Sequence, residues 1–406
     1  MRERVILHSD LNNFFASVET ILNPAFQGKP LIVCGDPKER RGVVLAKNEE
    51  AKKYGIKTAE TVYSALKKCP HVQRTQTHFS EYKKYSRLVR GIYERFTDVV
   101  EECSIDECSL DVTASVALFG SGEEIAEKIR AAVKAELGLT VSVGVSFNKS
   151  FAKLASEFKK PDAVSSIPKE RFREIVYPLP VASLLFVGKS TAETLKKRGI
   201  KTVGDLAQSE EQTIISLLGK RGRQLRLCAR GEDSEPVKAR KEKEDLKSIG
   251  NSSTLPYDVT SREEIKRWLY VLSESVAARL RDADVGRADT VHITVRDGAF
   301  KDYTYQCKVS PTLLCGDIAK AAYGLFCKNY PIGVGVRLIG VTVSGFDYHT
   351  EQLTIETAGE SKAYEKRERA ESAVAKIREK YGYSMLQRGV VIEDERLNGL
   401  DIRGKK

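Results

Sequence analysis

The sequence predicts an α+β protein with at least two domains, and three observations lead to this. The chain has 406 residues, whereas a single hydrophobic core stops growing at about 250–300 residues. Strand-like and helix-like patterns are mixed over the first 165 residues and again over residues 248–347. Between them, residues 166–232 carry only short helical patterns, and residues 233–247 are polar and charge-rich. We therefore expect two mixed domains separated by a helical region and a linker.

Short apolar strands and amphipathic helices follow one another in the first region. Gly55 is placed as a helix C-cap, and Pro161 stops the last helix. The expected strands are residues 4–10, 31–36, 41–47 and 139–148, with two strand-like halves in 99–113. The expected helices are residues 13–22, 48–56, 80–97, 122–137 and 151–161.

The second region contains longer strands. Thr290, His292 and Thr294 alternate with apolar residues, which is typical of a strand with one buried face. The expected strands are residues 248–255, 290–298, 303–310 and 336–346, and the expected helices are residues 261–282 and 315–329. The remaining tail, residues 348–406, holds one strongly charged helix at about 361–381, whose pattern indicates a solvated helix.

The composition restricts the class of protein. A net charge of +11 and a pI near 9.1 favour a polyanionic partner, most often nucleic acid. No apolar run approaches the ~20 residues of a membrane helix, and the first ten residues are not a signal peptide, so we expect a cytoplasmic protein. The eight cysteines form no CxxC pair, which favours reduced thiols over a zinc site.

Three carboxylates lie at strand ends. Asp10 ends the first strand, and Asp106 and Glu107 interrupt the predicted hairpin. Neighbours on a regular strand point to opposite faces, so both acids reach one metal only if the backbone bulges or turns there. Such a set could hold two Mg²⁺ ions for phosphoryl transfer. On spacing alone, a solvated hairpin tip stays an open alternative.

Three segments together resemble one family. They are LHSDLNNFFASVE (residues 7–19), SIDECSLDVT (104–113) and SVGVSFNKSFAKLASEFKKPDA (142–163). In this order they resemble the catalytic core of the Y-family DNA polymerases, the translesion enzymes that include bacterial DNA polymerase IV and UmuC-like proteins. The resemblance runs over about residues 4–347 and implies a fold like a right hand. The implied parts are a palm (1–19 and 76–165), fingers (20–75), a thumb (166–232), a linker (233–247), a little finger (248–347) and a tail (348–406).

The resemblance assigns roles to individual residues. Asp10, Asp106 and Glu107 match the family's carboxylates for two Mg²⁺ ions, and the backbone carbonyl of Leu11 would complete the nucleotide-side site. Phe15 matches an aromatic gate that clashes with a ribose 2′-hydroxyl. The residues expected to bind the nucleotide are Phe14, Phe15, Val44, Ala46, Lys52 and Lys160, of which Lys160 reaches the triphosphate.

The sequence departs from the family's pattern at four positions. Asn12 replaces a usual Asp, and Ala163 replaces a usual Gly. Where the family usually has a Tyr and an Arg on the triphosphate, this chain has Glu49 and Lys52. Lys52 keeps the charge but loses the bidentate fork of Arg. Glu49 would repel phosphate, so we expect it to turn outward.

The later segments resemble the DNA-holding parts of the family. Residues 184–207 resemble a helix-hairpin-helix, in which Gly188 permits a tight turn whose N–H groups can face a phosphate. The expected DNA contacts are Gly188, Lys189, Gly219, Lys220, Arg221, Arg223, Thr294 and Arg337. Residues 351–356 are similar to a clamp-binding peptide, with Gln352, Leu353 and Ile355 in place and the closing aromatic absent.

The resemblance implies a template-directed DNA polymerase of the lesion-bypass type, with low fidelity and no proofreading. Its partners would be primer–template DNA, dNTPs and a sliding clamp, and we expect a monomer that is not attached to a membrane. Two alternatives remain at this point. One is a nucleotide cyclase-like enzyme, because some cyclases share a palm-like fold. The other is a catalytically inactive DNA-binding protein, for which Glu49 and Lys52 are the best support.

Overall fold

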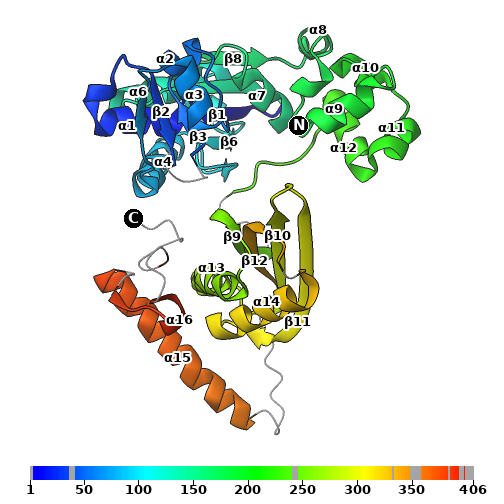
Figure 1. Cartoon of the computed structure of the whole chain (residues 1–406). Coiled ribbons are helices and arrows are strands. Elements are labelled where there is room, and N and C mark those ends of the chain that lie inside the picture. Colours follow the sequence, from blue (N-terminus) through cyan, green and yellow to red (C-terminus); the bar gives the residue numbers. More distant parts are fainter. Residues whose placement is uncertain are drawn as a thin grey trace. The chain divides into compact units, whose positions relative to one another are not determined.

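The computed structural model describes residues 3–35, 42–239, 246–331, 333–347, 358–382, 385–392 and 397. The chain divides into two compact units, one within Met1–Gly35 and Val43–Lys243 and the other within Glu244–Lys406. Each unit combines sheets and helices (Figure 1), which confirms the predicted α+β class and the separate second domain. The candidate clamp-binding residues Gln352, Leu353 and Ile355 lie outside the described residues.

A five-stranded sheet forms the centre of the first unit. Its strands are β1 (Ile6–Leu11), β5 (Val100–Glu102), β6 (Glu107–Asp111), β7 (Val141–Ser146) and β8 (Val164–Ile167), in the order β5-β6-β1-β7-β8. Strand β1 is buried along its whole length because β6 and β7 pair with it on both sides, antiparallel. The register places Asp10 opposite Glu107 on β6 and opposite Ser142 on β7.

Helices cover both the apolar residues of this sheet and its edges. Helices α1 (Phe14–Leu22), α4 (Phe79–Tyr93) and α6 (Gly122–Leu137) share one core with the sheet, and α5 (Val116–Phe119) is a short turn before α6. Helix α7 (Lys149–Ser156) begins at Asn148, whose side chain accepts a hydrogen bond from the Phe151 N–H. It lies directly on β7 at Gly144, where a Cβ would stand 1.9 Å from the Ala152 carbonyl oxygen.

A smaller sheet with its own core lies within residues 20–75. Its strands are β2 (Leu31–Cys34), β3 (Val44–Lys47) and β4 (Gln73–Thr75), in the order β3-β2-β4. A 3-10 turn, η1 (Pro24–Phe26), precedes β2, and helices α2 (Glu49–Lys53) and α3 (Val62–Lys68) pack on the sheet. The sequence analysis missed α3, β4 and β8, since all three are short.

The described part of the segment between β8 and the second unit contains helices and no named strand, as expected. They are α8 (Phe172–Val176), η2 (Val181–Ser183), α9 (Lys189–Lys196), α10 (Val203–Gln208), α11 (Glu211–Leu218) and α12 (Lys220–Ala229). The expected linker begins later than residue 233. Val237 is buried against Ile6 and Ala152, and the Asp233 carboxylate accepts a 2.6 Å hydrogen bond from the Ser150 hydroxyl. These contacts hold the start of the expected linker against β1 and α7.

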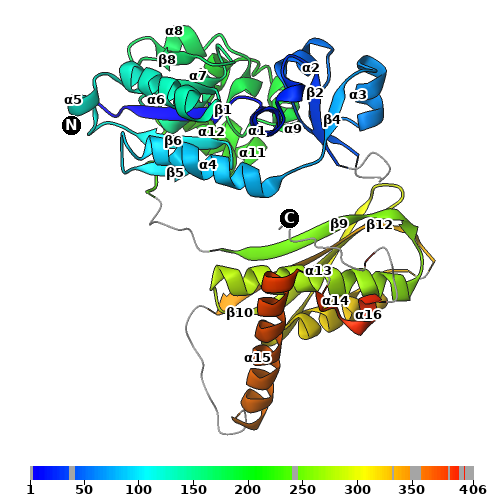
Figure 2. The same ribbon diagram turned by 90° about the vertical axis from the view of Figure 1, so that its left-hand side faces the viewer.

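The second unit is a four-stranded antiparallel sheet backed by two helices. Its strands are β9 (Ser248–Val259), β10 (Arg287–Asp297), β11 (Asp302–Thr312) and β12 (Val336–Asp347), in the order β11-β10-β12-β9. Figure 2 shows α13 (Arg262–Ala283) and α14 (Cys315–Asn329) side by side along this sheet. Val291, Ile293 and Val295 are buried in the core between the sheet and these two helices, as their alternation predicts.

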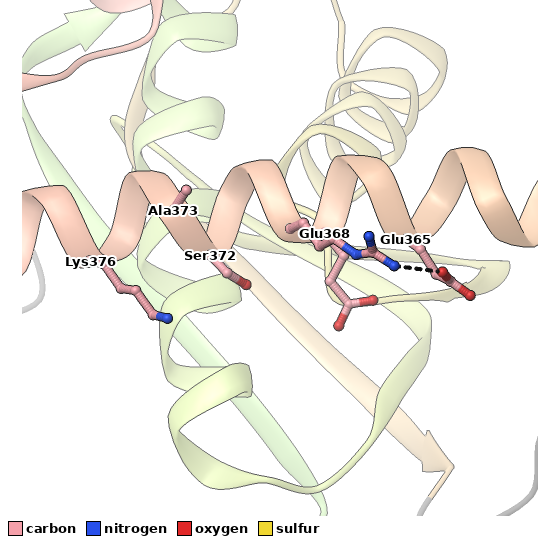
Figure 3. Close-up of a pocket in the computed structure, with 6 residues that line it drawn as sticks. Glu365, Glu368, Ser372, Ala373 and Lys376 are labelled. Carbon is pink, nitrogen blue, oxygen red and sulfur yellow. Dashed lines mark hydrogen bonds and ion pairs between the residues drawn. The ribbon is translucent and has the colours of Figure 1, made fainter.

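The last helices are α15 (Ala358–Tyr381) and α16 (Gly389–Ile392). Ion pairs attach them to α13, because Glu274 contacts Arg378 at 3.2 Å and Arg388 at 2.7 Å. Another face of α15 borders a hollow lined by polar side chains (Figure 3), where Arg369 pairs with Glu365 at 3.2 Å. This face of α15 is solvated and charged, as the sequence predicts, whereas Arg378 is buried against α13.

Within the described part of the chain, no helix is both long and apolar enough to cross a membrane.

Candidate active site

A cavity of about 360 Å³ opens where β1 ends and α1 begins. Strand β1 carries Asp10 and Leu11 to this point, the following turn carries Asn12 and Asn13, and α1 begins with two phenylalanines. The lining residues are Asp10, Leu11, Asn12, Asn13, Phe14, Phe15, Leu45, Ala46, Lys47, Lys52, Thr58, Asp106 and Lys160. Most of the residues predicted for metal and nucleotide binding are therefore brought together here. Val44 is fully buried in the smaller sheet instead.

The backbone turns at the acidic pair, as the sequence analysis required. The N–H groups of Cys103 and Ser104 both donate to the Glu107 carbonyl, at 3.0 and 3.2 Å, and close a tight turn before β6. Asp106 lies in this turn, and its carbonyl accepts a 3.0 Å hydrogen bond from the Leu11 N–H. Its carboxylate accepts a 2.6 Å hydrogen bond from the Ser104 hydroxyl. The turn therefore places the Asp106 carboxylate beside β1, while Glu107 pairs with Asp10 across the sheet.

Two lysines hold the carboxylates together. The Lys153 ammonium on α7 lies 3.1 Å from Asp10 Oδ2 and 2.7 Å from Glu107 Oε1. The Lys160 ammonium lies 2.7 Å from the same Asp10 oxygen. Glu157 also contacts both lysines, at 3.4 and 2.7 Å. Sequence reasoning missed Lys153, and its signal was a lysine inside the otherwise buried segment FAKLAS.

The surroundings move the pKa values of the two facing acids in opposite directions. Burial raises the pKa of Asp10, although the hydrogen bonds from Lys160 and Lys153 act against this shift. Interaction with His8, and then with Lys153, holds the pKa of Glu107 well below its usual range. His8 Nε2 lies 3.5 Å from Glu107 Oε2, and its Nδ1 lies 3.2 Å from the Ser109 hydroxyl. Glu107 is therefore ionised at neutral pH.

These residues fit a divalent cation. His8, Asp10 and Glu107 each offer a ligand atom, and the three atoms lie within 4.8 Å of one another. The Lys153 ammonium already lies against both carboxylates, which shows that the gap between them accepts a positive charge. Carboxylate oxygens are the ligands that Mg²⁺ prefers. His8 was not predicted, and the sequence gives no signal for it beyond its place two residues before Asp10.

Phe15 forms a rigid aromatic wall. Its ring stacks on Tyr82, with centroids 4.1 Å apart and an interplanar angle of 10°. Phe79 contacts it edge-on at 5.8 Å. The Tyr82 hydroxyl donates to the buried Glu19, so the stacking partner is itself fixed. Phe14 is only 3% exposed and belongs mainly to the core.

Glu49 lies next to the cavity without lining it. Its carboxylate oxygen accepts hydrogen bonds from Asn13 at 2.9 Å and from Lys52 at 2.6 Å, and both of these residues line the cavity. The hydrogen bonds offset the burial of Glu49 and lower its pKa. The ammonium of Lys52 is therefore partly neutralised by Glu49.

Asn12 makes two hydrogen bonds within the fold. Its Nδ2 donates to the Ser142 hydroxyl at 2.8 Å, and its Oδ1 accepts from the Asp162 N–H at 2.8 Å. Asn12 therefore ties β1 to the turn after Lys160.

Most of the residues predicted to contact DNA lie at exposed turns or helix starts. Gly188 is the N-cap of α9, followed by the exposed Lys189. Gly219, at φ 65°, separates α11 from α12, whose first residues Lys220 and Arg221 are exposed. Arg223 pairs with Glu211 at 3.1 Å. In the second unit, Thr294 and Arg337 are half-buried on neighbouring strands.

Comparison with known proteins adds the following findings. The impB/mucB/samB family matches residues 9–157, and its C-terminal domain matches residues 246–355. DNA polymerase IV of Acetivibrio thermocellus is 43% identical over 98% of this chain and 99% of that protein. DNA polymerase IV 1 of Bacillus subtilis is 35% identical over 97% of this chain and 94% of that protein. A solved Y-family DNA polymerase chimera superposes with a TM-score of 0.76 at 25% identity, covering 85% of this chain and 100% of the chimera.

Proposed function

The chain belongs to the impB/mucB/samB family, and from this premise we propose that it is a template-directed DNA polymerase of the lesion-bypass type. One observation carries the proposal. Asp10 and Asp106 line one cavity walled by an aromatic ring, and Glu107 pairs with Asp10 across the sheet, in a chain that matches polymerases of the same family over nearly its whole length. The cyclase-like and inactive alternatives have no comparable support.

In the proposed reaction, the primer 3′-hydroxyl attacks the α-phosphate of a dNTP and pyrophosphate leaves. Asp10, Asp106, Glu107 and the Leu11 carbonyl would hold two Mg²⁺ ions, which lower the pKa of the attacking hydroxyl and stabilise the leaving phosphate. Lys160, already beside Asp10, would reach the triphosphate. Phe15 would close the space next to C2′ of the sugar, because its ring cannot rotate away from Tyr82 without losing the stack.

We assign the parts of the family's hand to the elements of this chain. The five-stranded sheet with α1, α4, α6 and α7 would be the palm, and the three-stranded sheet the fingers. Helices α8–α12 would be the thumb, and the four-stranded sheet with α13 and α14 the little finger. The basic turns at Gly188 and Gly219 would hold DNA phosphates without reading bases.

The finer features of this proposal follow the family. We propose low-fidelity, distributive synthesis without proofreading, by a monomer acting in the cytoplasm. Segment 351–356 would bind a sliding clamp. Val44 and Ala46 would support the nascent base pair, Val44 through the core below it.

Primer extension tests the proposal. The wild type is compared with the double variant Asp106→Ala plus Glu107→Ala, on an undamaged template with Mg²⁺ and dNTPs. Glu170→Ala, an exposed acid that does not line the cavity, is the matched control. We expect extension by the wild type and the control, and none by the double variant, while all three bind primer–template DNA.

Three other results would contradict the proposal. DNA binding without extension by the wild type would indicate the inactive DNA-binding protein. Nucleotide turnover without a primer would indicate a cyclase. Unchanged extension by the double variant would show that these carboxylates are not the metal ligands.

A further inference from the structure

Two phenylalanines have a left-handed backbone. Among the described residues, the non-glycine positions with positive φ are Asn13, Ala59, Asp162, Phe186, Asp284 and Phe300. Asn and Asp tolerate this region because their short polar side chains can hydrogen-bond locally, whereas a bulky side chain there is strained. Phe186 has φ 67° and Phe300 has φ 65°. Glycine would fit both turns with less strain.

Neither ring is buried enough for the hydrophobic effect to offset this strain. Phe186 is 64% exposed and Phe300 is 63% exposed. An exposed apolar side chain gains little from the hydrophobic effect, which depends on the area removed from water. The fold therefore gives no reason for a phenylalanine at either position.

Instead, the side chain of an arginine stacks on each ring. The guanidinium of Arg221 lies over the Phe186 ring, 5.8 Å from its centroid. The guanidinium of Arg337 lies over the Phe300 ring at 4.4 Å. Within the described parts of the chain, neither arginine is in an ion pair with an acidic side chain. Both positive charges are thus oriented by a ring and left available to an anion.

The two Phe–Arg pairs have the same arrangement, although the local structures that surround them are unrelated. Phe186 lies two residues before the N-cap of α9, and Arg221 is in the first turn of α12. Phe300 lies in the turn between β10 and β11, and Arg337 is on β12, whose neighbour Val336 pairs with Asp297 at the start of that turn. Each of the two units therefore contributes one arginine stacked on a strained, exposed ring.

We propose that Phe186 and Phe300 are positioning residues for DNA binding, which orient Arg221 and Arg337 toward phosphates of the primer–template duplex. A guanidinium stacked on a ring keeps its N–H edges free, and these edges fit a phosphate in a bidentate way. The exposed part of each ring would rest against the adjoining deoxyribose. This inference rests on the proposed polymerase function and adds two residues that sequence comparison of motifs does not point to.

The test measures duplex affinity by fluorescence anisotropy at several salt concentrations, with the full-length protein and no dNTP. We expect Phe186→Ala and Phe300→Ala each to weaken binding by about 2–5-fold, the size of an exposed cation–π contact. Phe186→Tyr and Phe300→Tyr keep the ring and should keep the affinity. Adding Phe186→Ala to Arg221→Ala should weaken binding by less than about twofold further, because the ring acts through the arginine.

A second readout excludes a general loss of structure. Phe186→Gly removes the strain, so its thermal midpoint should stay the same or rise by up to about 2 °C, although it binds DNA as weakly as Phe186→Ala. Leu118→Ala, which trims a side chain that is 81% exposed and carries no cation over it, is the control and should leave affinity unchanged.

The outcomes separate this inference from the proposed function. If the wild type binds and extends DNA, but the alanine variants bind as tightly as the wild type, the positioning role is wrong and the polymerase stands. The same holds if the tyrosine variants bind as weakly as the alanine variants. If the wild type neither binds nor extends primer–template DNA, both proposals fail.

Discussion

Replacing Gly144 by alanine tests how the sheet positions the lysine between the carboxylates. Gly144 lies on β7 beneath α7, the helix that carries Lys153. A Cβ at this position would stand 1.9 Å from the Ala152 carbonyl oxygen and 2.4 Å from the Ser156 nitrogen. Both are backbone atoms, so no side chain can rotate to make room. The helix itself has to move.

The size of the effect follows from these distances. An ordinary contact needs about 3.4 Å, so the helix backbone must shift by about 1.5 Å. Overpacking of this kind costs about 1–3 kcal/mol, and two backbone clashes place Gly144→Ala at the upper end. The same shift would stretch the 2.7 Å contact between Lys153 and Glu107 beyond hydrogen-bonding distance. A misplacement of this size near reacting groups can lower a rate by about 100-fold.

Urea unfolding and single-turnover primer extension together measure this prediction. We expect Gly144→Ala to unfold at a lower urea concentration and to extend primers about 10–100-fold more slowly. Gly91→Ala is the matched control, because Gly91 lies in α4 with nothing within 4 Å of its added Cβ. That variant should be more stable by about 0.5–1 kcal/mol, through the better helix propensity of alanine.

An unchanged urea midpoint for Gly144→Ala would refute the reasoning, since it would mean that α7 does not lie directly on β7. A destabilised variant that still extends at the wild-type rate would refute only the link between helix position and catalysis.

Three further predictions concern single side chains. Phe15→Val should raise incorporation of ribonucleotides relative to deoxyribonucleotides in a gel-based extension assay, because the wall stacked on Tyr82 is lost; unchanged selectivity would exclude Phe15 as the gate. Glu49→Gln should lower the KM for dNTP by about threefold in steady-state extension, since the charge of Lys52 is released from a pair that is largely exposed and hence weak; an equal or higher KM would show that Lys52 does not meet the triphosphate. Backbone hydrogen bonds from Thr202 and Lys201 lower the pKa of Asp205, so this carboxylate stabilises α10 above the ordinary aspartate pKa of about 3.9, and the stabilisation is lost as pH falls through the lowered value. Asp205→Ala should therefore lower the thermal midpoint more at pH 7 than near pH 2, and an equal loss at both pH values would contradict this.

Most of the fold could be predicted from the sequence because the patterns that indicate its helices and strands are local. Helix α6 occupies residues 122–137 as predicted, since Ser121 and Glu124 form a capping box and Gly138 ends the helix at φ 67°. Strand β10 follows its alternation of Thr, His and Thr with apolar residues. Short elements such as β4 have no such signal, because three residues become a strand only when β2 lies beside them.

The sequence indicated which residue types lie at the candidate site, but not which charged side chains contact one another there. The turn at Asp106 and the aromatic wall at Phe15 follow from sequence and resemblance. The place of Lys153 does not, because it depends on α7 approaching β7 at Gly144. The contact between Glu49 and Asn13 could not be predicted for a similar reason, because these residues are 36 positions apart in the chain.

The two lysines at the carboxylates also determine how the protein behaves before any metal arrives. Buried acids at such short range repel one another, and in proteins whose metal ligands are otherwise unbalanced the ion is required for folding. Here Lys153 and Lys160 act as built-in counter-ions that offset part of this negative charge. We therefore expect folding not to depend on metal supply. Withdrawal of divalent ions would switch the protein off without unfolding it, and their return would restart it from an intact scaffold.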